Sequence, residues 1–182
     1  MRSVISKPNV PIILKPLDES DMDFFYAMYS NQDIMQYIGR PLTKAQANKQ
    51  LHETIKVMQT PDPHHLTYVI VHGDKQDKIG ITGLTWFDQN NRGVAEVGIM
   101  ISPDWRRQYW GHQSKKMMIS AAFEDFKIDV VYAFCQINNV AANAANEYLK
   151  LLKGRQIKAG VNQQLSQEWS IEKSSWIDSN FR

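Results

Sequence analysis

Apolar residues follow two different spacings along the chain, one typical of helices and one typical of strands. Helical spacing, with apolar side chains every three or four residues, appears early, over residues 21–31 and 43–61. Ser20 and Asp21 are candidate caps for the first of these segments, and the capping-box pair of Thr43 and Gln46 opens the second. The pattern therefore predicts two successive helices near the start of the chain.

Runs with strand character precede and follow these helices. The first apolar run ends at Leu17, and Pro16 confines that end to a sheet edge. Three later runs are separated by short polar turns, which is typical of an antiparallel meander. One further run is almost continuously apolar, as expected for a strand buried on both faces. In chain order the predicted strands are 12–17, 66–72, 78–87, 93–101, 130–136, 155–160 and 169–172.

Helical spacing returns twice in the second half. From Trp110 to Phe126 an apolar stripe predicts a helix that buries Met117 and Met118 and exposes Lys115 and Lys116. An alanine-rich segment predicts another helix over residues 140–152, ending near Gly154.

The order of elements defines the fold class. Strand, two helices, three strands, helix, strand, helix and two strands require antiparallel and parallel pairs in one sheet. We therefore expect an α/β (α+β) fold, a mostly antiparallel central sheet of about six or seven strands flanked by about four helices. Residues 1–182 read as one domain, with the first eleven residues loose.

Composition and charge exclude several classes of function. The chain has 182 residues, of which 43% are hydrophobic, and a net charge of +2 without a long basic block, so no nucleic-acid or membrane partner is expected. No apolar run approaches the roughly 20 residues that cross a bilayer, and no signal peptide is recognisable, so we expect a cytoplasmic protein. The single cysteine, Cys135, lies in an apolar run without metal-ligand spacing, which indicates a core thiol and no metal site.

The segment from Ala95 to Phe123 carries the candidate chemistry. An apolar strand passes through Pro103 into a turn rich in arginine and glutamine, Arg106–Gly111, which leads into a helix. Such a turn aims backbone N–H groups and a helix N-terminus at one point, which is the arrangement that binds phosphate.

Several strings of residues resemble one known family. Their order and spacing are similar to the GNAT superfamily of acyl-CoA N-acyltransferases, most closely to the branch that acetylates ribosomal-protein N-termini. The resemblance covers roughly residues 12–176. The strings are Leu14-Lys15-Pro16-Leu17 with Asp21, Met35-Gln36-Tyr37-Ile38 before Pro41, Ala95-Glu96-Val97-Gly98-Ile99, Pro103-Asp104-Trp105-Arg106, Ala122-Phe123-Glu124 and Asn139-Val140-Ala141-Ala142.

In the family, a turn of the pattern Arg/Gln-x-x-Gly-x-Gly/Ala binds the pyrophosphate of coenzyme A through backbone amides. Counting from both flanks places Arg106 first, Tyr109 at the first glycine and Gly111 last. The alternative register begins at Gln108 and puts Gln113 at the last small position. One small residue is missing in either register. The resemblance implies that the cofactor-binding turn comprises Arg106, Arg107, Gln108, Tyr109, Trp110, Gly111 and His112.

The strand before the turn carries the implied reaction. Glu96 is the only acid between Gly93 and Ile101, and it matches a position from which some relatives supply a catalytic base. An acetyl acceptor amine must lose a proton, and burial would raise the pKa of Glu96 into a useful range. An edge position or a structural salt bridge is the other reading of Glu96. By resemblance, the backbone of Ile99, Met100 and Ile101 pairs with the pantetheine arm.

The leaving thiolate also needs a proton donor, which in many relatives is a tyrosine on the last helix. Tyr148 is available, but counting from Asn139 puts the family's tyrosine position on Asn146 and its Gly-Phe pair on Lys150-Leu151. Counting backward from Gly154 instead moves the asparagine to Asn143. Asn139 and Asn143 are therefore rival cofactor contacts.

The resemblance implies an N-acetyltransferase that moves an acetyl group from acetyl-CoA, its co-substrate, to a primary amine by direct attack. The alternative is a catalytically weak or inactive domain that binds acyl-CoA or a partner protein, which the residue Tyr109 favours. The acceptor stays open between a small molecule and a protein N-terminus, and so does a homodimer. Trp86 and Phe87 are candidates to line the acceptor site or to pack, and His64-His65 reads as a solvated pair.

Overall fold

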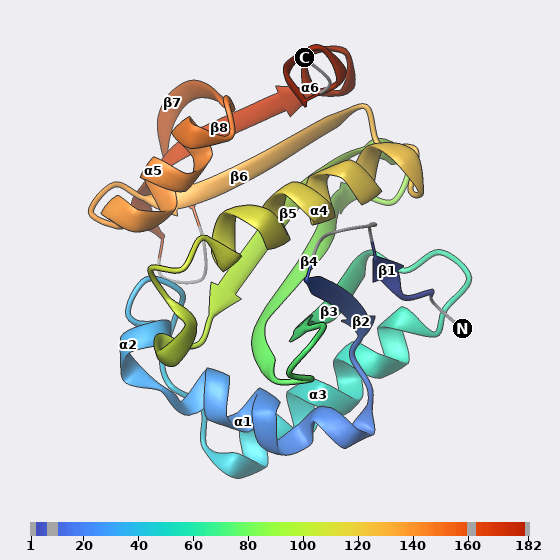
Figure 1. The fold of residues 1–182 in the computed structure, drawn as a ribbon, viewed down its shortest axis with the longest axis vertical. Helices are drawn as coiled ribbons and strands as arrows, with labels where there is room; N and C mark the ends of the chain where they lie inside the picture. Colours follow the sequence, from blue (N-terminus) through green and yellow to red (C-terminus); the bar gives the residue numbers. More distant parts are fainter. Residues whose placement is uncertain (1–2, 7–10, 160–162, 181–182) are drawn as a thin grey trace.

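The computed structural model describes residues 3–6, 11–159 and 163–180, whose strands form a single sheet (Figure 1). The spatial order is β1-β2-β3-β4-β5-β6-β8-β7. The pair β5–β6 is parallel and the other pairs of this described sheet are antiparallel, which confirms the predicted mixed, mostly antiparallel sheet. The strands are β1 (Ile5–Ser6), β2 (Ile12–Pro16), β3 (His65–His72), β4 (Lys78–Asp88), β5 (Asn91–Ile101), β6 (Val130–Gln136), β7 (Leu152–Ala159) and β8 (Gln164–Glu172).

Helices connect and cover these strands. In Figure 1, α1 and α3 lie side by side, and α4 runs across the sheet beside β4 and β5. The helices are α1 (Met22–Ser30), α2 (Gln32–Met35), α3 (Lys44–Met58), α4 (Trp110–Glu124), α5 (Val140–Tyr148) and α6 (Lys173–Asn180), with 3-10 turns at η1 (Glu19–Asp21) and η2 (Pro103–Trp105). None of the helices in the described ranges is both long and apolar enough to span a bilayer.

The predicted meander and its flanking helices are confirmed. Strands β3, β4 and β5 pair in sequence order, and the Thr43 capping box opens α3, where the hydroxyl of Thr43 accepts from the Gln46 amide (3.3 Å). Pro16 ends β2 opposite Tyr68 of β3, while the short β1 pairs only with Ile13 and Leu14. Pro16 therefore lies where β2 has a single neighbour, a position that tolerates its missing N–H.

The predicted cap at the start of α1 is wrong in its chemistry. The N-cap Asp21 makes no side-chain cap bond. Its fully buried carboxylate instead pairs with the ammonium groups of Lys15 (2.9 Å) and Lys78 (2.7 Å), which links β2 and β4 to the helix start. The side-chain cap of this region is a capping box at η1, in which Asp18 accepts from the amide of Ser20 (2.8 Å) and Asp21 accepts from the amide of Asp18 (3.0 Å).

The end of the chain differs most from the prediction. Helix α5 stops at Tyr148, before the expected Leu152, because Lys150 adopts a left-handed conformation (φ 61°) that ends the helix. Strand β7 begins at Leu152 and β8 at Gln164, so both of the last strands are longer than predicted. Gly160, the expected end of the strand that corresponds to β7, lies outside the described residues. Helix α6 was not predicted.

The core lies between the sheet and its helices. Helix α4 covers the sheet face that carries Ala95 and Val97, both buried, and Trp86 on β4 packs edge-on against Phe126 just beyond α4 (6.2 Å between ring centroids). Side chains alternate along a strand, so Glu96 and Gly98 belong to the opposite face of β5. This alternation decides which residues face the candidate site.

Candidate active site

A cleft opens where β5 and β6 separate. The two strands pair only from Val94–Glu96 to Val130–Tyr132, although β5 continues to Ile101 and β6 to Gln136. Each strand keeps its outer neighbour, β4 or β8, over this length. The facing backbone edges of β5 and β6 therefore part beyond Glu96, and a Cβ placed on Gly98 would have no heavy atom of the described chain within 4 Å.

The turn after β5 has the shape of an anion site. The first backbone bond of α4 runs from the Gln113 amide to the Tyr109 carbonyl (3.1 Å), so the amides of Trp110, Gly111 and His112 precede the intrahelical ladder. The side chains of Arg106 and Arg107 are exposed at this end, and the Nε of Arg106 donates to the Ile101 carbonyl (3.3 Å). Donors and positive charge thus converge on the open end of the cleft.

Tyr109 occupies a glycine-like backbone conformation. Its φ is 63°, as is that of Arg107, in the left-handed region that glycine adopts without cost. This φ favours the register in which Tyr109 stands at the first glycine of the family turn. A Cβ on Gly111, the last position, would make only an ordinary contact with Ile101 (3.6 Å), which fits a Gly/Ala position.

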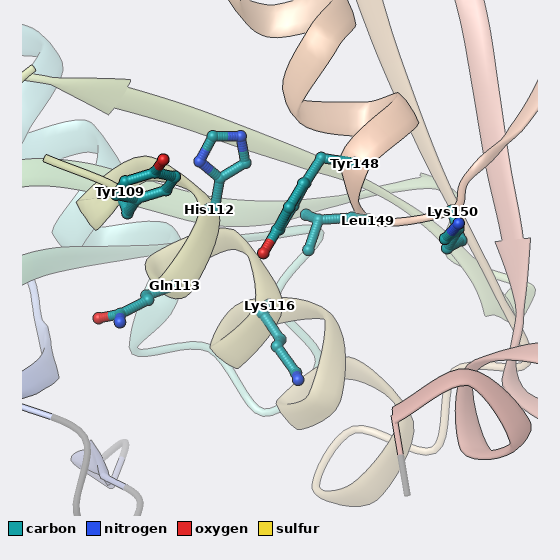
Figure 2. Close-up of a pocket in the computed structure, with 7 residues that line it drawn as sticks. All are labelled: Tyr109, His112, Gln113, Lys116, Tyr148, Leu149 and Lys150. Carbon is teal, nitrogen blue, oxygen red and sulfur yellow. The ribbon is translucent and has the colours of Figure 1, made fainter. Parts of the chain in front are cut away.

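A pocket of about 520 Å³ lies beside this turn, between α4 and the end of α5 (Figure 2). The rings of His112 and Tyr148 meet edge to face at 4.8 Å between centroids, and the ring of Tyr109, 69% exposed, lies on the other side of His112 (5.9 Å). The pocket therefore offers aromatic faces and two ammonium groups. It is lined by Tyr109, His112, Gln113, Lys116, Tyr148, Leu149 and Lys150.

Glu96 lies at the closed end of the cleft, in the last pair that joins β5 to β6. Its side chain is half-buried, and no hydrogen bond or ion pair reaches its carboxylate from the residues that the structure describes. Burial raises the pKa of Glu96 above its ordinary value, and the positive charge of Lys115 opposes that shift. A carboxylate with a raised pKa and unused acceptors is suited to take a proton.

Polar and aromatic side chains share the face of Glu96. The cross-strand partner of Glu96, Thr85, hydrogen-bonds with Nδ1 of His65 (2.8 Å), and the side chain of His65 is half-buried. The prediction of a solvated His64-His65 pair is therefore wrong for His65. Tyr132 pairs with Glu96 across the parallel strands, and its ring packs against the exposed Phe87 (6.0 Å). Trp86, in contrast, is buried on the other face, under the guanidinium of Arg92 (3.9 Å).

Lys115 is buried, so the prediction of an exposed Lys115 is wrong. Its side chain is 3% exposed, and its ammonium donates to Oδ1 of Asn146 on α5, which is fully buried. The Nδ2 of Asn146 in turn contacts Sγ of Cys135 on β6 (3.2 Å). Cys135 itself is half-buried, less enclosed than the predicted core thiol.

The register of α5 follows the count from Asn139. The side chain of Asn139 caps the helix by accepting from the Ala142 amide (3.2 Å), and Lys150, with its positive φ, stands where that count puts the family's glycine. Asn143 is engaged elsewhere. Its Nδ2 donates to the carbonyls of Gln136 and Asn139, and its Oδ1 accepts from Nε1 of Trp169 (all 2.9 Å). Asn139 is therefore the more available of the two for a ligand.

The other predicted site residues divide between the two ends of the cleft. The half-buried Ile99, Met100 and Ile101 form the β5 edge beyond Glu96. Tyr148 is 65% exposed at the pocket rim, away from Asn146, which occupies the buried face of α5.

Sequence reasoning missed Lys115 and Asn146 as parts of the site. A signal for Lys115 was present, because it lies three and four residues before the buried Met118 and Ile119 on α4. That spacing places the three side chains on one face of a helix.

Comparisons with known proteins agree with this geometry. The family model described as "Acetyltransferase (GNAT) domain" matches residues 12–150. The chain belongs to this acetyltransferase family, whose members use acetyl-CoA as co-substrate to acetylate an amine. The match of the family model over residues 12–150 is what assigns the chain to this family.

Solved structures share the fold over nearly the whole chain. A GNAT-family acetyltransferase from Bacillus anthracis is 13% identical, with a TM-score of 0.79 over 94% of this chain and 99% of that one. Spermidine N-acetyltransferase from Vibrio cholerae, solved with CoA and spermine, is 17% identical (TM-score 0.80, 93% and 99%). RimL, the ribosomal L7/L12 alpha-N-protein acetyltransferase, solved with coenzyme A in a disulfide to a cysteine, is 15% identical (TM-score 0.80, 93% and 98%).

Proposed function

We propose that this chain acetylates a primary amine by direct attack on acetyl-CoA held in the β5–β6 cleft, with Glu96 as the general base. The observation that carries the proposal is the position of Glu96. It is a half-buried carboxylate, without a partner among the described residues, at the closed end of a cleft whose open end is the helix N-terminus of α4.

The pyrophosphate end belongs at the turn. The amides of Trp110, Gly111 and His112, together with the positive end of the α4 dipole, suit two adjacent phosphate groups. Arg106 and Arg107 add charge there and compensate for the bulk of Tyr109. The side chain of Tyr109 is exposed and lies beside His112 at the pocket, so the turn keeps its backbone donors (Figure 2).

The nucleotide end fits the pocket beside α4. Aromatic faces of Tyr109, His112 and Tyr148 can stack on a base, and Lys116 and Lys150 can pair with the 3′-phosphate of coenzyme A. In this arrangement Tyr148 binds the cofactor and does not act as the acid, because its side chain lines the pocket assigned to the nucleotide.

The pantetheine arm then runs along β5. Beyond Glu96 the edge of β5 from Val97 to Ile101 has no partner on the β6 side in the described sheet, so its backbone groups can pair with an amide-containing arm as a strand would. The Nδ2 of Asn139 has no partner among the residues that the structure describes, so it can donate to the arm from the β6 side. Since the phosphates lie at the open end, the thioester reaches the closed end, beside Glu96.

Glu96 would then remove a proton from the attacking amine. The amine must be neutral to attack, and a buried carboxylate with a raised pKa accepts that proton more readily than an exposed one. The nitrogen bonds to the carbonyl carbon as the carbon–sulfur bond breaks, without a covalent enzyme intermediate. Nothing in this step requires a nucleophilic side chain.

The acceptor would approach over the face of Glu96. Tyr132, Phe134 and Phe87 form an aromatic cluster there, in which the Tyr132 and Phe134 rings are nearly parallel (3°) at 6.1 Å. This uncharged wall suits an amine attached to an apolar group, such as a protein N-terminus with a hydrophobic first side chain, better than it suits a polyamine, which needs several carboxylates.

The test compares wild type with Glu96→Gln across pH, with acetyl-CoA and a panel of N-terminal peptides and polyamines. In wild type, kcat should rise with pH through the pKa of Glu96, and the variant should lose about 100-fold or more in kcat together with that rise. An unchanged profile in the variant would exclude Glu96 as the base. CoA at 100 times its Kd should add about 2.7 kcal/mol to the free energy of unfolding, which a thermal melt detects as a rise in Tm. Such a rise with no turnover on any amine would instead favour the non-catalytic alternative.

A further inference from the structure

Lys115 is a buried cation whose charge is only partly compensated. Its side chain is 3% exposed, and its one hydrogen-bond acceptor among the described residues is the amide oxygen of Asn146. No carboxylate of the described chain lies within salt-bridge distance of its ammonium. Removing an ammonium from water is costly, and a neutral amide offsets only part of that cost.

Lys115 lies beside the separated part of β6, because its partner Asn146 contacts Cys135, three residues beyond Tyr132, the last residue of β6 that pairs with β5. Its charge acts on Glu96 of β5 and on Cys135 of β6, the two strands that separate at this point. Lys115 comes from α4, which covers the face of Ala95 and Val97, whereas Glu96 belongs to the opposite face. A group held at the closed end therefore lies between a carboxylate on one side of the sheet and an ammonium on the other.

Three elements fix the ammonium in place. Asn146 on α5 accepts from Lys115 and contacts the sulfur of Cys135 on β6 (3.2 Å). Asn146 cannot itself give up a proton, since an amide is not an acid at neutral pH. The bond to Asn146 instead orients the ammonium, which keeps two further N–H donors.

We propose that Lys115 is a catalytic residue, the general acid that protonates the sulfur of coenzyme A as it leaves. This proposal rests on the proposed function. The nitrogen of the acceptor bonds to the carbonyl carbon, the carbon–sulfur bond breaks with its electron pair on sulfur, and the Lys115 ammonium gives its proton to that sulfur. Glu96 holds the proton taken from the amine, and its return to the neutral Lys115, directly or through water, restores both groups.

The charges around Lys115 support this role. Burial lowers the pKa of Lys115, while Cys135 and Glu96 oppose the shift, so the ammonium is a stronger acid than an exposed lysine. Burial lowers the pKa of His112 on the same helix, and the charge of Lys115 lowers it further. A donor acidity closer to that of a thiol makes proton transfer to sulfur more efficient.

The first experiment compares the kcat–pH profiles of wild type and Lys115→Met, with the exposed Lys56→Met on α3 as the matched control. We expect kcat of Lys115→Met to fall by about 100-fold or more and its alkaline limb to disappear, while the acid limb set by Glu96 stays. Lys56→Met should match wild type. A Lys115→Met profile that keeps the alkaline limb, or a kcat within about threefold of wild type, would overturn the proposal.

The second experiment uses the wild-type protein alone, so it does not depend on the folding of a variant. The thiolate of bound coenzyme A is titrated by its ultraviolet absorbance in wild-type protein, with desulfo-coenzyme A as the reference that cancels Cys135. For the Lys115 ammonium to give its proton to the sulfur, the bound thiol must be the weaker acid of the two, so it should ionise at or above the pKa of about 8.5 that is ordinary for a thiol. Ionisation below that pKa would show that the sulfur stays a thiolate beside the ammonium, and it would refute Lys115 as the acid. Because this measurement requires no acceptor, it separates a failure of Lys115 from a failure of the proposed acetyl transfer.

Discussion

The left-handed backbone of Tyr109 gives a prediction whose sign can be worked out from the structure. For residues other than glycine, a φ near 63° costs about 1–2 kcal/mol. Tyr109→Gly relieves that cost but adds about 0.5–1 kcal/mol of backbone entropy in the unfolded chain. The ring is 69% exposed, so its loss removes little packing, and Tyr109→Ala accounts for that loss separately.

The expected difference is therefore between the glycine and alanine variants, which differ only in the Cβ. Tyr109→Gly should be more stable than Tyr109→Ala by about 1 kcal/mol, or about 2–4 °C in Tm for a chain of this size. The matched pair at a helical site, Lys56→Gly and Lys56→Ala in α3, should show the opposite order, by about 1 kcal/mol. Denaturant unfolding and calorimetry measure both pairs. If the glycine variant at position 109 is also the less stable, the turn does not hold the glycine-like conformation.

Three further predictions concern the cleft and its pocket. Because burial raises the pKa of Glu96, ionisation of its carboxyl destabilises the folded protein as pH rises. Glu96→Gln should therefore have a higher Tm than wild type at neutral pH. In calorimetry this difference in Tm should vanish below the ordinary carboxyl pKa. Lys116→Glu should weaken CoA binding by about tenfold in calorimetric titrations and weaken dephospho-CoA much less; equal losses would remove Lys116 from the 3′-phosphate site. A Cβ at Gly98 would meet no heavy atom of the described chain within 4 Å, so Gly98→Val should fold normally and keep its affinity for CoA but raise KM for the acceptor; an unchanged KM would place the acceptor elsewhere.

The sequence predicted the sheet well because its signals there are local. The apolar runs of β3, β4 and β5 are short, rich in residues that favour strands, and bounded by polar turns. The same locality explains the success with α3, whose capping box is complete within four residues. Elements of this kind need no knowledge of the rest of the chain.

The errors come from contacts between distant segments. Asp21 looks like a cap, but Lys15 and Lys78 from two different strands take its carboxylate. Lys115 looks like a solvent-facing charge, but Asn146, 31 residues later, gives it a buried partner. Neither the Asp21 ion pairs nor the Lys115–Asn146 hydrogen bond can be recognised from neighbouring residues in the sequence. The helical spacing of Lys115 with buried apolar residues did, however, indicate that Lys115 is buried.

A third kind of error concerns glycine. Tyr109 and Lys150 both adopt positive φ values at positions where the family resemblance puts glycine. A sequence rule that expects glycine wherever φ is positive finds a flawed turn at Tyr109. At Lys150 the same rule misses the end of the helix and predicts a longer one. The backbone shape is kept at both positions, at the cost of some strain, because the surrounding structure determines it.

The central claim is that coenzyme A lies between β5 and β6 with its phosphates at the start of α4. Hydrogen exchange of the backbone amides, measured with and without CoA, tests this most directly. The account predicts slower exchange in two segments on binding, Val97–Ile101 and Arg106–His112, because their N–H groups gain partners. Saturating CoA that leaves both segments unchanged, or that slows exchange only in other strands, would contradict it.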